Sequence, residues 1–170
     1  MTATYDKIAT YTVTGSAQAS YTFTNISQAY TDLFVICNLV GVPTGQGFRY
    51  QAGTSGTLDT GNNYSYTWLS GNNTAAASGR VSSANQGQIG WAWQGSSEKS
   101  SVIYANFQNY SNTTTFKTAV GRTADSGLES AAIVNLWRST NAITDLRLFP
   151  STSTTMGVGS TLNLYGIKAE

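Results

Sequence analysis

Residues 159–168, GSTLNLYGIK, alternate in the way a half-buried β-strand alternates. Leu162 and Leu164 fall on one face of this segment, and Tyr165 and Ile167 fall on the other. A strand this close to the end of the chain needs partner strands that are already in place. In a two-sheet Greek-key sandwich the first and last strands commonly pair, so residues 8–13, IATYTV, are the predicted partner of this closing strand.

The rest of the chain repeats the same alternation at short intervals. Glycine, asparagine, proline and serine clusters between the alternating segments favour tight turns. Strands that recur in this way predict a β-sandwich or barrel, and no repeat or linker divides the chain, so we expect one domain over residues 1–170. The further strands that we expect cover residues 21–24, 32–40, 48–51, 63–69, 89–94, 102–108, 116–120 and 143–149.

Three segments need separate interpretation. Residues 32–40, DLFVICNLV, form a continuous apolar run that fits a strand buried on both faces. Residues 72–85 are rich in serine, alanine and glycine and are expected to form a long exposed loop. Residues 129–138, ESAAIVNLWR, fit either a short helix or a strand, and we favour the strand because the surrounding sequence is all β.

The composition is poor in charge. Charged residues make up 10% of the chain against about 25% in ordinary soluble domains, and the formal net charge is +1. No basic stripe is present to neutralise phosphates, so we expect no nucleic-acid partner. No segment approaches about 18 consecutive apolar residues, so we expect no membrane-spanning segment. An aromatic content of 12% nevertheless predicts a folded chain with a neutral polar surface.

Residues that could carry catalysis are scarce. The chain contains no histidine, which removes the imidazole base, the Ser-His triad and the common zinc sites. Cys37 lies in the apolar run and is expected to be a buried hydrophobic residue. Asp125 and Glu129 are expected to be solvated acids of a turn, and residues 59–63, DTGNN, lack the further acids of a calcium loop. We therefore expect no catalytic residue, no cofactor, no metal site and no enzymatic activity.

Tryptophans are the other residues through which the chain could recognise a partner. Trp91 and Trp93 are two residues apart, so in a strand they point to the same face. The flanking residues in GWAWQG are glycine or polar, which favours exposure of at least one ring. Core packing is the ordinary role of such side chains. The functional alternative is a contact with a partner protein or a glycan through Trp91 and Trp93.

Four stretches together resemble a group of small virion-surface proteins of tailed bacteriophages, frequent among cyanophages. They are YDKIATYTVTGSAQASYTFTNI at 5–26, GNNYSYTWLSGN at 61–72, LWRSTNAITDLRLFP at 136–150 and the closing segment at 159–168. The resemblance runs from about Tyr5 to Lys168. It implies an all-β, jelly-roll-like antiparallel β-sandwich in which the closing segment is the terminal strand.

The resemblance also implies a function. Proteins of this kind are structural components of the virion, and some decorate or cement the capsid as trimers. We accordingly expect a capsid decoration or cement protein, made in the host cytoplasm, that forms a homotrimer and binds the major capsid protein on the outside of the phage head. The alternative is a glycan-binding head-fibre or tail module for host attachment. A glycosidase is a third hypothesis, and it requires two acids about 5–10 Å apart in a cleft.

Overall fold

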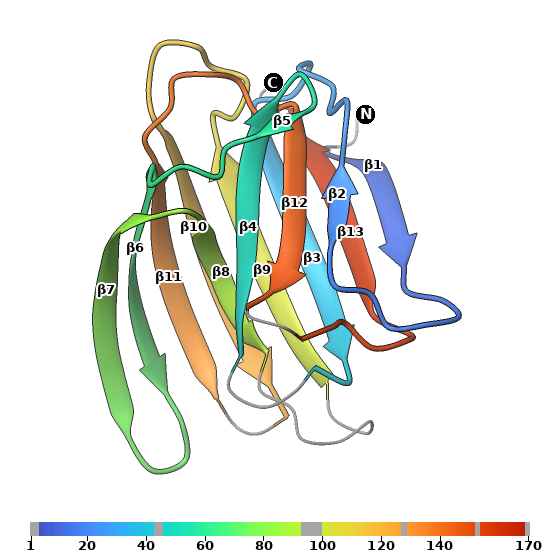
Figure 1. The fold of residues 1–170 in the computed structure, drawn as a ribbon, viewed down its shortest axis with the longest axis vertical. Coiled ribbons are helices and arrows are strands. Elements are labelled where there is room, and N and C mark those ends of the chain that lie inside the picture. The colour runs from blue at the N-terminus through green and yellow to red at the C-terminus, as the bar shows by residue number, and fades with distance from the viewer. Residues whose placement is uncertain (1–3, 43–45, 93–99, 127–128, 152–153, 169–170) are drawn as a thin grey trace.

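The computed structural model describes residues 4–42, 46–92, 100–126, 129–151 and 154–168. All regular structure in these residues is β-strand (Figure 1). The strands are β1 (Tyr5–Thr12), β2 (Tyr21–Phe23), β3 (Asp32–Val40), β4 (Gln46–Thr54), β5 (Thr57–Leu58), β6 (Tyr64–Gly71), β7 (Ala76–Ala84), β8 (Gly87–Ala92), β9 (Ser100–Gln108), β10 (Lys117–Asp125), β11 (Ser130–Trp137), β12 (Asp145–Pro150) and β13 (Thr161–Ile167).

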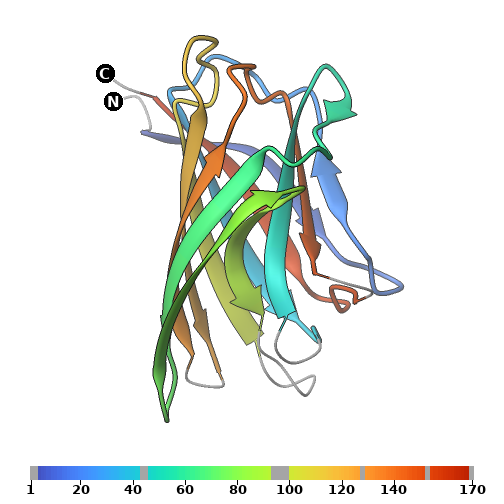
Figure 2. The same cartoon turned by 60° about the vertical axis from the view of Figure 1, so that its left-hand side comes forward.

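Two antiparallel sheets pack face to face as a sandwich, which confirms the predicted fold class. The larger sheet has eight strands in the order β1-β13-β3-β9-β10-β11-β6-β7. The smaller sheet has five strands: it runs β2-β12-β4-β5, and β8 also pairs with β4. Figures 1 and 2 show the two layers, with β6 and β7 at one margin of the larger sheet.

Eight of the strands follow the order of a jelly roll. One sheet contains β1-β13-β3-β9, and the other contains β2-β12-β4-β8. The chain passes from one sheet to the other eight times: between β1 and β2, β2 and β3, β3 and β4, β5 and β6, β7 and β8, β8 and β9, β11 and β12, and β12 and β13. This alternation is that of two interlocked Greek keys. The remaining strands are insertions in this framework. Strands β6, β7, β10 and β11 widen the larger sheet beyond β9.

The closing strand lies where the sequence predicts. Strand β13 pairs with β1 from Ile167 opposite Tyr5 to Thr161 opposite Thr12, and it pairs with β3 on its other side. Leu162 and Leu164 are fully buried between the sheets. The alternation in residues 159–168 therefore corresponds to a strand that lies between β1 and β3.

The structure corrects two predictions and decides a third. Residues 72–85 are not a loop, because most of them form β7 at the edge of the larger sheet. Residues 32–40 are not buried on both faces, because Phe34 and Ile36 are only half-buried on the side away from the smaller sheet. Residues 130–137 form β11, so the strand is correct and the helix is not.

Strand β8 sits unusually close to the larger sheet. A Cβ atom on Gly121 of β10 would lie 2.2 Å from the carbonyl oxygen of Ile89, so the absence of a side chain there lets the two backbones approach. The side chain of Asn135 accepts from Gln88 N at 2.9 Å and donates to Gln88 O at 2.7 Å. The Thr123 hydroxyl accepts from Trp91 N at 3.0 Å. Side chains of the larger sheet therefore satisfy backbone groups at the edge of β8.

Candidate functional site

The side of the larger sheet that points away from the smaller one carries exposed apolar side chains among polar and charged ones such as Lys7, Thr67 and Gln108. Because side chains alternate along a strand, the buried residues Leu33, Ile103 and Ile133 have neighbours that point outward. We call this surface the outer face. Its outward side chains include Tyr5, Phe34, Ile36, Leu69, Val102, Tyr104, Asn106, Val120, Arg122, Ala124, Ala132, Val134 and Leu136, with polar residues of the same strands between them.

The outer face concentrates the exposed apolar side chains. Of the eight exposed large hydrophobic residues in the described ranges, five lie on it. They are Tyr5 (55% exposed), Leu69 (62%), Tyr104 (43%), Val120 (36%) and Val134 (56%). Exposed apolar side chains gathered on one face in this way, with Thr67, Asn106 and Arg122 between them, indicate a site of interaction.

Aromatic rings continue the outer face across the strands. The rings of Tyr5 and Phe34 meet edge to face with centroids 5.9 Å apart, and Phe34 stacks beside Tyr104 at 6.3 Å. These rings stand on β1, β3 and β9. The contacts hold large side chains in fixed positions before any partner arrives, which lowers the entropic cost of binding.

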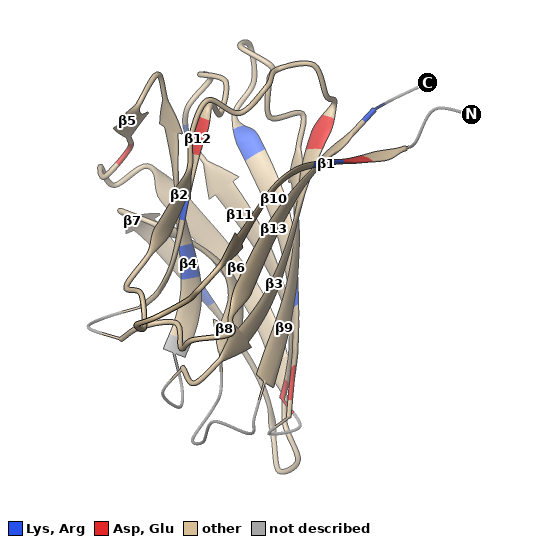
Figure 3. Ribbon diagram, turned by 90° about the vertical axis from the view of Figure 1, so that its right-hand side faces the viewer, with Lys and Arg blue, Asp and Glu red and all other residues tan. Residues whose placement is uncertain are grey.

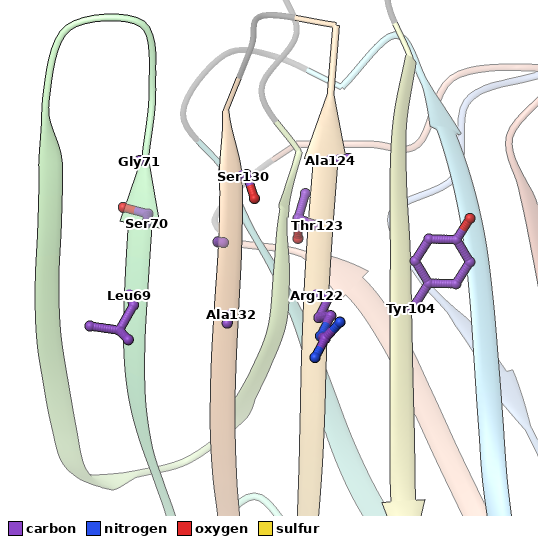
Figure 4. A pocket seen from close by; sticks show the side chains of 10 residues that line it. Leu69, Ser70, Gly71, Tyr104, Arg122, Thr123, Ala124, Ser130 and Ala132 are labelled. Atoms are coloured by element: carbon purple, nitrogen blue, oxygen red, sulfur yellow. The ribbon is translucent and has the colours of Figure 1, made fainter.

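Arg122 lies between two shallow depressions on the outer face. One, of about 630 Å³, is lined by Leu69, Tyr104, Arg122 and Ala132 among others (Figure 4). The other, of about 480 Å³, is lined by Phe34, Tyr104, Val120 and Arg122 among others. In the described parts of the chain the one salt bridge joins Lys168 and Asp6, so Arg122 has no ion-pair partner in them. The exposed guanidinium can pair with an acceptor on a partner.

Charge is sparse elsewhere on the strands. Figure 3 shows isolated Lys, Arg, Asp and Glu positions on a ribbon that is otherwise uncharged. Depletion of charge around aromatic and aliphatic side chains is the composition of an interface centre. The outer face can therefore lose its water while burying few unpaired charges. Burial of an unpaired charge would oppose association, because it is costly in free energy.

The predicted tryptophan site is described only in part. Trp91 is half-buried on β8, and its ring packs edge to face against Trp68 with centroids 5.2 Å apart. Trp93 lies outside the described residues. The spacing of the tryptophans predicts a role for Trp91 but not for Trp68, which comes from the opposite sheet. The sequence likewise does not predict the outer face, although apolar residues at successive positions of β9 and β11 are a sign of it.

Asp59 and Asp145 serve as hydrogen-bond acceptors within the fold. The Asp59 carboxylate accepts from Trp137 Nε1 at 2.7 Å, from Asn63 Nδ2 at 2.9 Å and from Gly61 N at 2.9 Å. Burial raises the pKa of Asp59, but these hydrogen bonds outweigh it and hold the pKa below its usual value. Asp145 accepts from Gly56 N at 2.8 Å. Both carboxylates therefore stabilise the fold through these hydrogen bonds.

Asp125 and Glu129 lie at the β10–β11 turn, as the sequence predicts, but they are half-buried and not the solvated acids that we expect from the sequence. Glu129 N donates to Asp125 Oδ1 at 3.1 Å. Partial burial, with a contribution from the Asp125 charge, raises the pKa of Glu129. The residues that the structure describes contain no group of three or more histidine, cysteine, aspartate or glutamate side chains able to hold a metal ion. Cys37 is buried, and burial raises the pKa of its thiol.

No protein-family model matches the chain, and no curated protein is significantly similar to it. In the described ranges, no helix is long and apolar enough to cross a membrane.

Proposed function

We propose that this protein is a structural component of a tailed-phage virion, a capsid decoration or cement protein that docks on the outside of the head through its outer face. The observation that carries the proposal is the set of exposed apolar side chains on the outward side of the eight-stranded sheet. Major capsid protein is the proposed partner, and the protein is proposed to act as a homotrimer at the capsid surface. The sequence resemblance to virion-surface proteins supports the same assignment.

The dimensions of the outer face suit this role. Eight strands spaced about 4.8 Å apart span about 34 Å, and strands of eight or nine residues are about 28 Å long. The product is roughly 950 Å², against about 800 Å² that each partner buries in a standard protein–protein interface. One sandwich therefore offers enough surface for a specific complex on a single face.

Binding of this kind stabilises an assembled shell by mass action. A protein that binds only the assembled capsid favours that state over free subunits, and the gain grows with the logarithm of its free concentration. Because charges contribute little to the outer face, the affinity is expected to change little with salt.

The test is reconstitution on heads that lack the protein. Purified protein is added to such heads, and bound protein is measured after sedimentation, together with the temperature at which the heads rupture. Saturable binding with a raised rupture temperature is expected. Absence of binding at micromolar protein rules out the decoration role. Light scattering on the free protein is expected to give three times the 18.0 kDa chain mass, and a monomer at high concentration contradicts the trimer.

A further inference from the structure

The larger sheet ends in an edge strand, β7, that is nine residues long (Figure 1). In the parts of the chain that the structure describes, β7 pairs with β6 and with no other strand. Alternate residues of an edge strand direct their N–H and C=O groups away from the sheet, where these groups can pair with another chain. Natural proteins therefore shorten such edges, cover them, or place charges and bulges on them.

The other sheet edges in the described ranges are protected. Strand β2 has three residues and β5 has two. The side chains of Asn135 and Thr123 hydrogen-bond to backbone groups of β8. Strand β1 carries Asp6, which pairs with Lys168 at 2.6 Å, as well as the charge of Lys7 and a bulge that follows Lys7. Each of these features hinders the addition of a further strand.

Most of β7 lacks such protection. Residues 76–81 pair one to one with residues 66–71 of β6, and the bulge of β7 lies beyond them, at Ser82 and Ser83. Arg80 is the one charged residue of this segment, and the segment contains no proline. The backbone of residues 76–81 therefore forms a regular, open edge about 20 Å long.

We propose that residues 76–80 of β7 pair with the same residues of a second copy of this chain, across a two-fold axis perpendicular to the sheet. Such an axis reverses the direction of the second strand, so the two β7 strands are antiparallel. It also keeps both outer faces on the same side of the joined sheet. Two copies can then dock on one surface while they remain paired.

Charge selects the register of this pairing. Side chains on the same side of the sheet must stand opposite one another, so the axis passes through a residue and not between two. With the axis at Ser78, Arg80 stands opposite Ala76 of the second copy, and the two Arg80 residues are about 14 Å apart. With the axis at Gly79, the two Arg80 residues become diagonal neighbours about 7–8 Å apart. Repulsion between like charges therefore favours the axis at Ser78.

The pairing joins the two outer faces into one surface. Ser78 stands opposite Leu69 of β6 in register, and the Leu69 side chain is 62% exposed on the outer face. A row that runs Leu69, Ser78, Ser78 of the second copy and Leu69 of the second copy therefore crosses the axis. The proposed interface with the shell thus continues from one copy to the next without a break.

The pairing is weak by itself. Five residues span about 17 Å and a sheet layer is about 10 Å thick, so each copy buries roughly 170 Å². Each partner of a standard interface buries about 800 Å². Pairing therefore needs copies held at high local concentration, as on a capsid. This role rests on the proposed function: β7 links neighbouring trimers across two-fold axes that are normal to the shell, as the threefold axes of the trimers are.

The test traps the pair covalently in the free, full-length protein. Ser78→Cys places two thiols at the axis with Cα atoms about 4.5–5.5 Å apart, which is within the range of a disulfide. Cys37, the only native cysteine, is buried. Oxidation with copper phenanthroline is expected to give a species of twice the 18.0 kDa chain mass on a non-reducing gel. Thr10→Cys, also exposed but on β1, is the matched control and is expected to cross-link at least about tenfold more slowly.

A charge at position 76 tests the register. In the Ser78→Cys chain, Ala76→Glu places a carboxylate opposite Arg80 of the second copy and is expected to speed cross-linking about threefold. Ala76→Lys places a like charge there and is expected to slow it about threefold. Both effects are expected to weaken in high salt, because the charges are exposed.

Two results on the free protein would overturn the proposal: cross-linking of Ser78→Cys no faster than that of Thr10→Cys, or equal rates in the Ala76→Glu and Ala76→Lys chains. If Ser78→Cys on heads cross-links to a capsid chain and not to a second copy, the edge binds an extended segment of another protein instead.

A second pair of variants covers a failure of Ser78→Cys to fold, as judged by urea denaturation. Chains with Ala76→Cys are then mixed with chains with Arg80→Cys, because these positions stand opposite each other across the axis. Absence of the mixed disulfide also contradicts the proposal. Head binding is measured separately, so a free chain that pairs through β7 but does not bind heads refutes only the proposed function.

Discussion

Replacing both Leu69 and Val134 by threonine removes apolar surface from the β6 and β11 part of the outer face and keeps two residues that favour strands. These side chains are 62% and 56% exposed in the free protein. Full burial of a leucine or valine contributes about 1.5–3 kcal/mol, so roughly 1–2 kcal/mol per side chain remains for a partner to gain. Threonine retains part of this, so the double variant is expected to lose about 2 kcal/mol, or about 30-fold in affinity.

The assay is the dissociation constant for heads that lack the protein, measured by sedimentation. Unfolding in urea provides the stability control, and the double variant is expected to stay within about 0.5 kcal/mol of the parent because both sites are exposed. Val158→Thr is the matched variant, since Val158 is 53% exposed in a turn away from the outer face. An unchanged affinity in the double variant, or an equal loss in Val158→Thr, refutes docking through the outer face.

Three further predictions concern the fold. Gly121→Ala is expected to destabilise the protein by about 1–3 kcal/mol in urea, because its Cβ would meet the Ile89 carbonyl oxygen at 2.2 Å; an unchanged midpoint contradicts the close approach of β8. Asn135→Ala is expected to cost about 1–3 kcal/mol, since it leaves two backbone groups of β8 unpaired, and a change under about 0.5 kcal/mol in urea argues against this role. Burial and Asp125 raise the folded-state pKa of Glu129, so the folded protein binds more protons than the unfolded chain just above pH 4.5, and stability falls as the pH rises through that window. Glu129→Gln removes this fall in a series of thermal melts between pH 4 and 7, and a persistent fall shows that another group causes it.

Most of the fold prediction rests on the local alternation of apolar and polar residues along the chain. It located the closing strand and its pairing with β1, because Leu162 and Leu164 repeat with the period of the pleat. It did not locate β7, because a strand at a sheet edge with a mostly exposed pattern needs few apolar residues. Composition alone therefore could not separate this edge strand from a loop.

The sequence alone does not predict surfaces that form between distant segments of the chain. The outer face joins Leu69 of β6 to Tyr104 of β9 across strands that are not consecutive in the chain, and only the strand order makes them neighbours. The partnership of Trp91 with Trp68 likewise depends on the packing of β8 against the larger sheet. The sequence of residues 32–40 predicts burial on both faces, because Phe34 and Ile36 are apolar whether they face a core or an exposed surface. Only the structure shows that they point outward and are half-buried.

A cryo-electron microscopy reconstruction of intact virions tests the central claim most directly. The account predicts sandwich-shaped density in threefold groups on the outside of the head, with the eight-stranded sheet toward the shell and β4 and β8 toward solvent. Density for this chain at the tail or a single vertex, or on the head with the outer face turned to solvent, would contradict it.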